Sequence, residues 1–515
     1  MTMVAGGRYP LEARYRRYPT IVHALDDAAE RVPDRAALIV QDRRLSYRQY
    51  RSAAAGMARR FEALGARGRA VSICMGNGLE AAVAIHGAMA AGALATPMNP
   101  NYTPAELKPL LADVGPHILC CDPATEARCR DYAKELGIPH LEVLKPGTAD
   151  AWAADAALRL PEPLPRAGDP SAMFFTGGTT GLPKGAEHTH ATLVAHSYAM
   201  LALWPIGLDG ETMLNVAPLF HIWGFCLTLI DPVIVGATAV LLPAYKPAEV
   251  LAQFVQHKVT IFAGGPPALY IGLRANENYA KTDWQHLRWC LSGGAPCPEE
   301  LLRAWEKETG TEILEGVGMS EGAPYASMPM HGPHKLRSVG VMPPDTVVEI
   351  VDLGSGTTVL PAGQAGEIRV KGPQFIARYR NRPEESAKTF RHGWLYTGDI
   401  GQFDEDGYLF IVDRKKEMIL VGGYNVYPRE IDEMLHHHPA ILEAATVGVP
   451  DSFSGEAVKA YVALKPGATL DRAALETYCK ERLVKYKWPK HIEFLDALPK
   501  TGVGKINKLA LKARK

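Results

Sequence analysis

The segment from Thr176 to Gly185, with the sequence Thr-Gly-Gly-Thr-Thr-Gly-Leu-Pro-Lys-Gly, limits what this chain can fold into more than any other segment. Four of its ten residues are glycine, three are threonine and one is lysine. Glycine allows φ > 0, so successive backbone N–H groups can point inward around an anion, and the hydroxyls and the ammonium add further donors. We therefore predict a phosphate-binding loop.

The residues around this loop predict a short buried strand before it, at 172–175, and a helix after it, at 188–203. The loop departs from the G-x-x-x-x-G-K-[ST] pattern, because Lys184 follows Pro183 and precedes Gly185. The alternative is a flexible surface turn, but such a turn has no need of a lysine behind a proline.

The length and charge of the chain bound its class. A chain of 515 residues predicts several domains. Its 56 Lys and Arg balance 56 Asp and Glu, so no basic field recruits nucleic acid. The eight cysteines include no C-x-x-C pair, and no apolar run follows the N-terminal arginines. Both features favour a cytoplasmic protein with free thiols and no signal peptide.

One apolar segment needs comparison with a membrane span. Residues 212–230 contain no Asp, Glu, Lys or Arg, but Asn215, Pro218 and His221 interrupt them. We expect a buried strand, a turn and a core helix here, and no transmembrane span. Peripheral membrane contact stays open.

Strands and helices alternate with short loops in the first third of the chain, which predicts a wound α/β layer. A similar alternation continues from 172 to about 335. Predicted helices cover 21–31, 46–64 and 81–91, with another opened by 103–106, and predicted strands cover 36–40, 71–75 and 93–98.

The texture changes after residue 339. Short strands at 346–351, 366–370 and 407–412, separated by glycines, predict a small β-barrel-like subdomain. A compact α+β segment follows, long enough for a second domain. We predict a mixed α/β fold with a large N-terminal domain, 1–413, and a small mobile C-terminal lid, 414–515.

Five further motifs carry chemistry, although each is weak alone. The first motif suits a buried aromatic gate, and the second suits bare backbone packed against a flat ring. The third suits phosphate and Mg²⁺, and the fourth suits a ribose. The fifth places a lysine on a glycine-rich tip. In this order, the motifs are Phe220 to Gly224, Ser292 to Pro296, Glu315 to Glu321, Tyr396 to Asp399 and Leu498 to Lys505.

Together with the loop at 176–185, these blocks resemble the ordered motifs of the adenylate-forming superfamily, which includes acyl-CoA synthetases, peptide-synthetase adenylation domains and firefly-type luciferases. The resemblance extends from about Tyr18 to the C-terminus and includes the segment 413–419. It implies two wound α/β subdomains, a β-barrel and a lid. It also implies two reactions: a carboxylate attacks the α-phosphate of Mg·ATP, and a thiol then displaces AMP.

The resemblance implies a role for each matching residue. The β- and γ-phosphates fall to Thr176, Gly177, Gly178, Thr179, Thr180, Gly181 and Lys184. Adenine falls to Gly294, Ala295, Pro296, Gly316, Val317, Gly318 and Met319, with Glu315 in the same nucleotide block. The α-phosphate falls to Ser320, Mg²⁺ to Glu321, the ribose to Asp399, the nucleotide to Arg414, and the oxygens joining carboxylate and phosphate to Lys505.

The same resemblance implies a hinge and an acyl pocket. Lys416 matches the hinge position, and the passage for the pantetheine of CoA falls to Gly422, Gly423 and Tyr424. His221 matches a gate between acyl pocket and thiol tunnel. The acyl pocket is assigned to His221, Trp223, Gly293 and Gly322.

Two positions depart from the family pattern. Val317 stands where a tyrosine is usual, so an aliphatic face replaces a stacking face for adenine. Lys508 stands where arginine is common, which keeps the charge.

The branch of the superfamily follows from two features. Residues 219–226 contain no carboxylate to pair an amino-acid ammonium, which favours a plain carboxylic acid, either a medium- or long-chain fatty acid or an aryl acid. The basic C-terminal segment suits the phosphates of CoA, and it suits an acidic carrier protein too. We predict a free-standing acyl-CoA ligase. Carrier-protein loading, a non-catalytic family member and a homodimer stay open.

Overall fold

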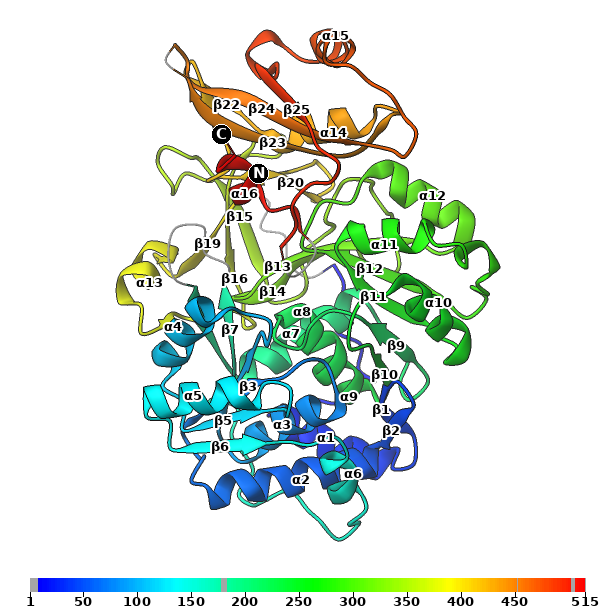
Figure 1. The fold of residues 1–515 in the computed structure, drawn as a ribbon, viewed down its shortest axis with the longest axis vertical. Helices are drawn as coiled ribbons and strands as arrows, with labels where there is room; N and C mark the ends of the chain where they lie inside the picture. The colour runs from blue at the N-terminus through cyan, green and yellow to red at the C-terminus, as the bar shows by residue number, and fades with distance from the viewer. Residues whose placement is uncertain (1–7, 177–182, 452, 502–504, 515) are drawn as a thin grey trace.

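The structure, a computed structural model, describes residues 8–176, 183–451, 453–501 and 505–514. Two wound α/β layers form the lower part of the molecule in Figure 1, a smaller β-sheet lies above them, and the C-terminal segment forms a cap. The predicted fold class, a large N-terminal domain with a small C-terminal one, is confirmed.

The first layer is a seven-stranded sheet in the order β17-β8-β7-β4-β3-β5-β6. Its central strands are parallel and fully buried, as expected of a sheet covered by helices on both faces. The strands are β3 (Ala70–Cys74), β4 (Leu94–Met98), β5 (Ile118–Cys121), β6 (His140–Val143), β7 (Pro170–Thr176), β8 (Lys184–Thr189) and β17 (Tyr379–Arg380).

The second layer is an eight-stranded sheet in the order β14-β13-β12-β11-β9-β10-β1-β2. The carboxyl ends of its parallel strands β11, β12 and β13 meet at one edge, where a wound sheet presents its ligand site. The strands are β1 (Ala36–Val40), β2 (Arg43–Ser46), β9 (Thr212–Asn215), β10 (Thr238–Leu241), β11 (Ile261–Gly265), β12 (Trp289–Gly293), β13 (Ile313–Met319) and β14 (Gly322–Ser327).

Helices cover both layers. Ser46 and Gln49 form a reciprocal capping box at the start of α2, which fixes where that helix begins. The helices are α1 (Ile21–Arg31), α2 (Tyr47–Ala63), α3 (Leu79–Ala90), α4 (Pro104–Val114), α5 (Glu126–Leu136), α6 (Thr148–Ala153), α7 (His190–Leu203), α10 (Pro247–Gln256), α11 (Pro267–Arg274), α12 (Glu299–Thr309), α13 (Pro383–Thr389) and the 3₁₀ turn η2 (Tyr279–Lys281).

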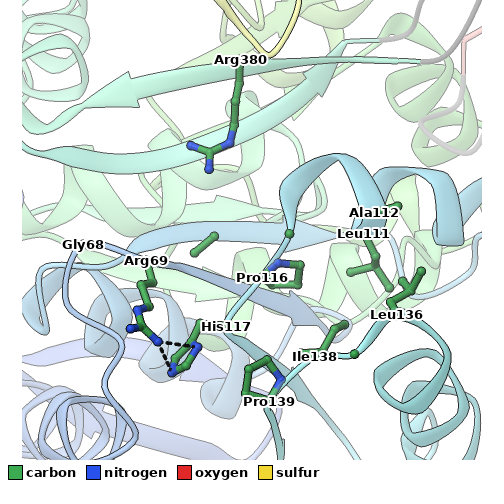
Figure 2. A pocket seen from close by; sticks show the side chains of 13 residues that line it. Gly68, Arg69, Leu111, Ala112, Pro116, His117, Leu136, Ile138, Pro139 and Arg380 are labelled. Atoms are coloured by element: carbon green, nitrogen blue, oxygen red, sulfur yellow. Dashed lines mark hydrogen bonds between the residues drawn. The ribbon is translucent and has the colours of Figure 1, made fainter.

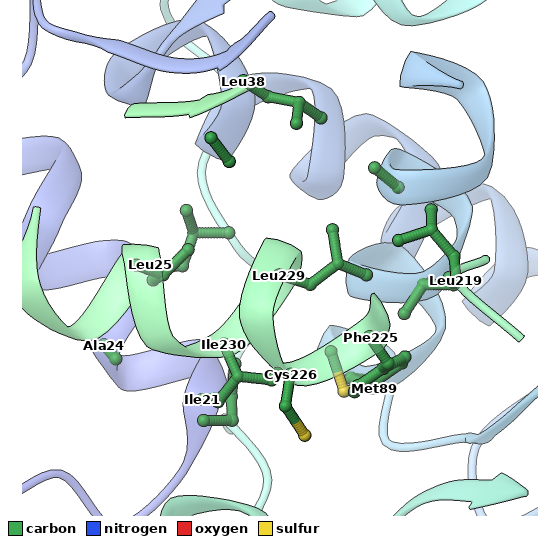
Figure 3. Packing of buried hydrophobic residues seen from close by; sticks show 14 of the residues in the cluster. Ile21, Ala24, Leu25, Leu38, Met89, Leu219, Phe225, Cys226, Leu229 and Ile230 are labelled. Atoms are coloured by element: carbon green, nitrogen blue, oxygen red, sulfur yellow. The ribbon is translucent and has the colours of Figure 1, made fainter. Parts of the chain in front are cut away.

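The apolar segment 212–230 lies in the core between the two layers. After β9 it forms α8 (Ile222–Phe225), the π-helical turn η1 (Cys226–Ile230) and α9 (Asp231–Val235). Figure 3 shows Leu229 and Ile230 of η1 packed among side chains of α1 and α3. No helix in the described ranges is long and apolar enough to cross a bilayer.

A half-barrel closes the large domain above the two layers. Its strands follow the order β15-β16-β19-β18, with β20 paired to β19. They are β15 (Val347–Val351), β16 (Gly366–Lys371), β18 (Phe390–Arg391), β19 (Trp394–Phe403) and β20 (Leu409–Arg414).

The lid has its own sheet, β22-β21-β24-β23, with β25 parallel to β24, and its own apolar core. Its strands are β21 (Ile419–Val421), β22 (Tyr424–Val426), β23 (Ile441–Asp451), β24 (Gly455–Leu464) and β25 (His491–Phe494). Its helices are α14 (Pro428–His436), α15 (Arg472–Arg482), the 3₁₀ turn η3 (Lys485–Lys487) and α16 (Lys508–Lys512).

Sequence periodicity misplaced one element and missed others. His188 and Thr189, predicted as the start of a helix, end strand β8, because β8 pairs antiparallel with β7 across the phosphate loop. The ten-residue strand β19 and the short hairpin of β21 and β22 were not predicted. The two hairpin strands have three residues each, which is too short to show a period of two, and glycines at 398 and 401 interrupt the pattern of β19.

Candidate active site

Glu321 occupies the tight connection between β13 and β14. Its side chain is buried, and one carboxylate oxygen accepts a hydrogen bond from the Tyr379 hydroxyl on β17. Burial raises the pKa of Glu321, while the Tyr379 hydrogen bond and the charge of Lys184 oppose the rise. Glu321 is therefore a buried carboxylate that Tyr379 holds in place close to Lys184.

Lys184 begins β8, and its ammonium lies 4.6 Å from the centre of the Tyr379 ring. It is paired with Thr176 at the end of β7, so the hairpin brings both ends of the predicted phosphate loop to Glu321. The predicted loop residues between them lie outside the described residues: Gly177, Gly178, Thr179, Thr180 and Gly181.

The backbone of Ser320 is held by His188, a residue that the sequence analysis did not assign to the site. The carbonyl of Ser320 accepts a hydrogen bond from Nε2 of His188, at 2.8 Å. Burial lowers the pKa of His188 to about 4, so the ring is neutral at pH 7. His188 lies three residues beyond Gly185, and only its pairing in the hairpin distinguishes it from the other histidines of that segment.

The predicted adenine blocks meet at the ends of β12 and β13, where Gly293 pairs with Gly316. The Glu315 carboxylate accepts a hydrogen bond from the Cys297 N–H at 3.0 Å, which joins the segment 294–297 to β13. Burial raises the pKa of Glu315 to about 7. Val317 is half-buried and packs against the core of the half-barrel.

Asp399, the predicted ribose ligand, is buried on β19 between two partners. Tyr325 donates a hydrogen bond to Oδ2 at 2.8 Å, and Nε of Arg414 lies 3.0 Å from Oδ1. Arg414 is paired with Asp399 across β19 and β20. The pairing holds the two side chains next to each other, just before the lid begins.

Lys505 reaches this site from the lid. A Cβ atom built on Gly294 would lie 2.9 Å from Cε and 3.1 Å from Nζ of Lys505, so the lysine packs directly on that glycine. Burial, and then the charge of Arg414, lower the pKa of Lys505 to about 8, and the charge of Asp399 opposes the shift. The structure thus brings the predicted catalytic lysine to the predicted nucleotide residues.

The predicted acyl gate also assembles here. The Trp223 ring packs on Gly293, where a Cβ atom would lie 2.9 Å from the indole. His221 caps α8, its Nδ1 accepting the Trp223 N–H at 3.2 Å. Burial, and then the charge of Lys505, lower the pKa of His221 to about 4. Gly322 lies against Phe375, whose ring leaves no room for a Cβ.

The predicted hinge borders this cluster, two residues after Arg414, and the predicted CoA residues form the tip of a separate hairpin. Lys416 is exposed in a turn closed by the N–H groups of residues 417 and 418 on the Arg414 carbonyl. Gly422 and Gly423 form the tip of the hairpin of β21 and β22, with φ of 56° and 86°, and a Cβ at either would meet nothing within 4 Å. Tyr424 stacks on Tyr486 of the lid at 4.6 Å. In this arrangement the hairpin does not line the site.

An ion pair joins the lid to the large domain. Arg337 donates to the Glu433 carboxylate on α14, which also accepts from Arg429. The backbone N–H of Arg429 donates to Asp413 at 2.9 Å, at the start of the hinge. These contacts hold the lid in the position that places Lys505 in the site.

A cavity of about 530 Å³ lies elsewhere, at the C-terminal ends of α4 and α5. Figure 2 shows Arg69 hydrogen-bonded to His117 on one side of it and Arg380 on the other. None of the predicted site residues lines this cavity. Across the described chain, no group of three or more His, Cys, Asp and Glu side chains forms a metal site, so a metal here would depend on Glu321 and on ligand oxygens.

The fold and this set of residues define an adenylate-forming enzyme. The profile of the AMP-binding enzyme family matches residues 25–380, and that of the AMP-binding enzyme C-terminal domain matches residues 430–505. The chain therefore belongs to the AMP-binding enzyme family. The predicted superfamily, and the acid–thiol ligase class within it, are confirmed.

Relatives and solved structures of known name resemble most of the chain. A long-chain-fatty-acid–CoA ligase of Bacillus subtilis is 35% identical over 525 residues, covering 95% of this chain and 93% of that protein. A feruloyl-CoA synthase of an Amycolatopsis species is 35% identical over 426 residues, covering 82% and 84%. The crystal structure of ATP-bound MatB from Rhodopseudomonas palustris is 29% identical, with a TM-score of 0.89, covering 96% and 98%.

Proposed function

We propose that this protein is an ATP-dependent acyl-CoA ligase that joins a carboxylic acid to AMP, with release of pyrophosphate, and then transfers the acyl group to CoA. The observation that carries this proposal is the packing of Lys505 on Gly294, next to Asp399 and Arg414. Lys505 brings a positive charge from the lid to this cluster, where it can stabilise negative charge that develops during a reaction.

The first reaction follows from the charges. Lys184 on β8 and Lys505 in the lid each bring a positive charge to the site, and Arg414 on β20 adds a third. Such groups stabilise the negative charge that builds up when a carboxylate oxygen attacks the α-phosphate and pyrophosphate leaves. Neutral His221 and Trp223 would exclude water from the acyl side.

The residues also fit Mg²⁺, which prefers one or two carboxylates together with substrate phosphates. Glu321 would hold it through its carboxylate, and the ion would neutralise phosphate oxygens when bound. Tyr379 keeps that carboxylate oriented through its hydroxyl.

The second reaction needs a different lid position, because Gly423 lies outside the present site. Rotation about Lys416 would replace Lys505 with the hairpin tip, and the two glycines there would leave room for a pantetheine arm. The relatives' names support CoA as the acceptor, and the acids in those names include long-chain fatty acids, ferulate and sulfoacetate. A fatty or aryl acid is our proposal for this chain.

The test uses the purified full chain with Mg·ATP and a panel of acids from acetate to palmitate, with benzoate and cinnamate. We expect pyrophosphate release that depends on one of these acids and AMP release that depends on CoA. Replacing CoA by a phosphopantetheinylated carrier protein separates the alternative acceptor. Glu321→Gln and Lys505→Ala serve as matched inactive controls. Absence of acid-dependent pyrophosphate release across the panel would overturn the proposal.

A further inference from the structure

A buried polar cluster, formed by His196, Ser197 and Asp231, lies deeper in the large domain and has no role in the reactions above. His196 and Ser197 belong to α7, and Asp231 begins α9 directly after the π-helical turn η1. The exposed fractions of His196 and Asp231 are 6% and 1%. The Ser197 hydroxyl donates a hydrogen bond to Oδ1 of Asp231.

Much of the hydrogen-bonding capacity of this cluster is unused. Among the residues that the structure describes, Oδ2 of Asp231 has no hydrogen-bond partner. Within the same ranges, the ring nitrogens of His196 form no hydrogen bond of regular geometry, although the ring approaches the Ala323 carbonyl. Nε2 and Oδ2 face each other at 4.0 Å, which is too long for a direct hydrogen bond. A buried polar atom without a partner costs about 1–3 kcal/mol, so such atoms need an explanation.

The charge state of the cluster limits what can fill the gap. Burial lowers the pKa of His196 to about 4, and the nearby Ala323 carbonyl opposes that shift. Burial raises the pKa of Asp231 to about 7, and Ser197 opposes that shift. No arginine or lysine of the described chain forms an ion pair with Asp231. An anionic group would be repelled here, whereas an uncharged donor and acceptor would satisfy both sides.

The cluster lies at the inner end of the elements that carry the predicted acyl pocket. Helix α7 packs against β14, which begins at Gly322, and against η1. The same helical run that holds Trp223 continues through η1 to Asp231. Eight residues at 1.5 Å each separate these two side chains by roughly 12 Å along the run.

We propose that His196 and Asp231 bind a hydroxyl group at the far end of the acyl substrate, and that the enzyme therefore selects acids carrying an uncharged terminal hydroxyl. The hydroxyl oxygen accepts a hydrogen bond from a His196 N–H and donates one to Asp231 Oδ2. An oxygen about 2.8 Å from each atom bridges their gap. An extended medium-chain ω-hydroxy acid has the required reach. A hydroxyaryl propenoic acid is shorter, so the two kinds of acid test different lengths. This inference rests on the proposed ligase function.

The test compares pairs of acids that differ by one hydroxyl: 4-hydroxycinnamate with cinnamate, and 10-hydroxydecanoate with decanoate. The measured quantity is kcat/KM for pyrophosphate release by the wild-type chain. We expect the hydroxylated acid to be favoured at least tenfold in one of the pairs. Equal rates in both pairs, or a preference for both unhydroxylated acids, would mean that a buried water fills the gap, and would overturn the inference.

Variants link the preference to the cluster. In the double variant Asp231→Leu with His196→Phe, we expect the hydroxyl preference to disappear while the KM for ATP stays the same. Its Tm is measured beside the kinetics, because Asp231→Leu removes an unpaired oxygen but also leaves the buried Ser197 hydroxyl without its acceptor. Asp231→Asn keeps the shape and a carbonyl acceptor, so it should retain the preference. A preference that survives the double variant would contradict the assignment.

The two proposals fail in different ways. If acids of the panel drive pyrophosphate release without any hydroxyl preference, the ligase function stands and only this inference is wrong. If no acid drives pyrophosphate release, the ligase function fails and this inference fails with it.

Discussion

The nucleotide side of the site and the lid are built in different ways. In the large domain, Glu321 and Asp399 are buried, with 4% and 6% of their surface exposed, and each accepts a tyrosine hydroxyl. In the lid, Lys416 is exposed, and a Cβ atom at position 422 or 423 would meet nothing within 4 Å. Under the proposed function, the binding groups would be fixed by the core, whereas the order of the two reactions would depend on movement of the lid.

The largest effect is expected for Lys505→Ala. Removing the ammonium takes a cation from the lid side of the site and should slow acyl-adenylate formation by about 10²- to 10³-fold. Thioester formation from prepared acyl-AMP should survive, because that reaction uses a different lid position. The two half-reactions are measured separately by pyrophosphate release and by thioester yield. Equal loss in both would contradict the division between core and lid.

The pH dependence of adenylation should report the same lysine. Lys505 must be protonated to act, and its pKa is lowered to about 8, so kcat/KM should fall as pH rises through 8. Above that pH the fall should be about tenfold per unit. Lys505→Arg keeps its charge throughout this range, so its profile should stay flat at a lower rate. A wild-type profile that stays level to pH 9.5 would show that the ammonium is not required.

Lys416→Pro tests the hinge. Proline fixes φ near −65° and should slow thioester formation by about tenfold or more, because it limits rotation of the lid. Adenylation should keep its rate, since no described backbone hydrogen bond uses the Lys416 N–H. Lys415→Ala is a neighbouring control that removes a side-chain contact with Glu367 without restricting the backbone. Unchanged rates in both half-reactions would place the hinge elsewhere.

Val317→Tyr tests the nucleotide side of the site, in the large domain. If an aromatic face is missing beside adenine, the tyrosine should tighten ATP binding by roughly 0.5 to 1.5 kcal/mol, measured by calorimetry. The KM for the acid should stay nearly unchanged. Val317 is half-buried against the half-barrel, so a larger side chain could instead press on its neighbours. Weaker ATP binding or an altered acid preference would mean that this position makes room for its neighbours.

The smallest effect is expected at the ion pair between the two parts. Arg337→Asn removes the contact with Glu433 and tolerates the left-handed backbone at this position, where φ is 69°. A surface ion pair contributes about 0.2–1 kcal/mol, so adenylation should slow by at most about fivefold, and less at high salt. Arg303→Ala, which breaks a pair within α12, is the control. An effect as large as that of Lys505→Ala would show that the lid position depends on this one contact.

Local pattern was sufficient for much of the fold and for the ordered motifs. The predicted helix at 46–64 corresponds to α2, and the apolar run after Thr212 predicted a strand and a core helix. Glycine at 294, followed by a proline two residues later, predicted bare backbone at a strand end, and Lys505 packs there. Short segments fix such features, because helix capping, periodicity and glycine content act over a few residues.

The sequence by itself determined the superfamily, the α/β layers and the kinds of side chain that the site would need. Only the tertiary structure decided which groups orient them: His188 beneath Ser320, 132 positions apart, and Tyr379 on Glu321, 58 positions apart. It also decided that His196 and Asp231 face each other at 4.0 Å, with no partner for Asp231 Oδ2 among the described residues. These contacts join strands and helices that are far apart in the chain. The sequence pattern of each segment does not show which other segment it will pack against.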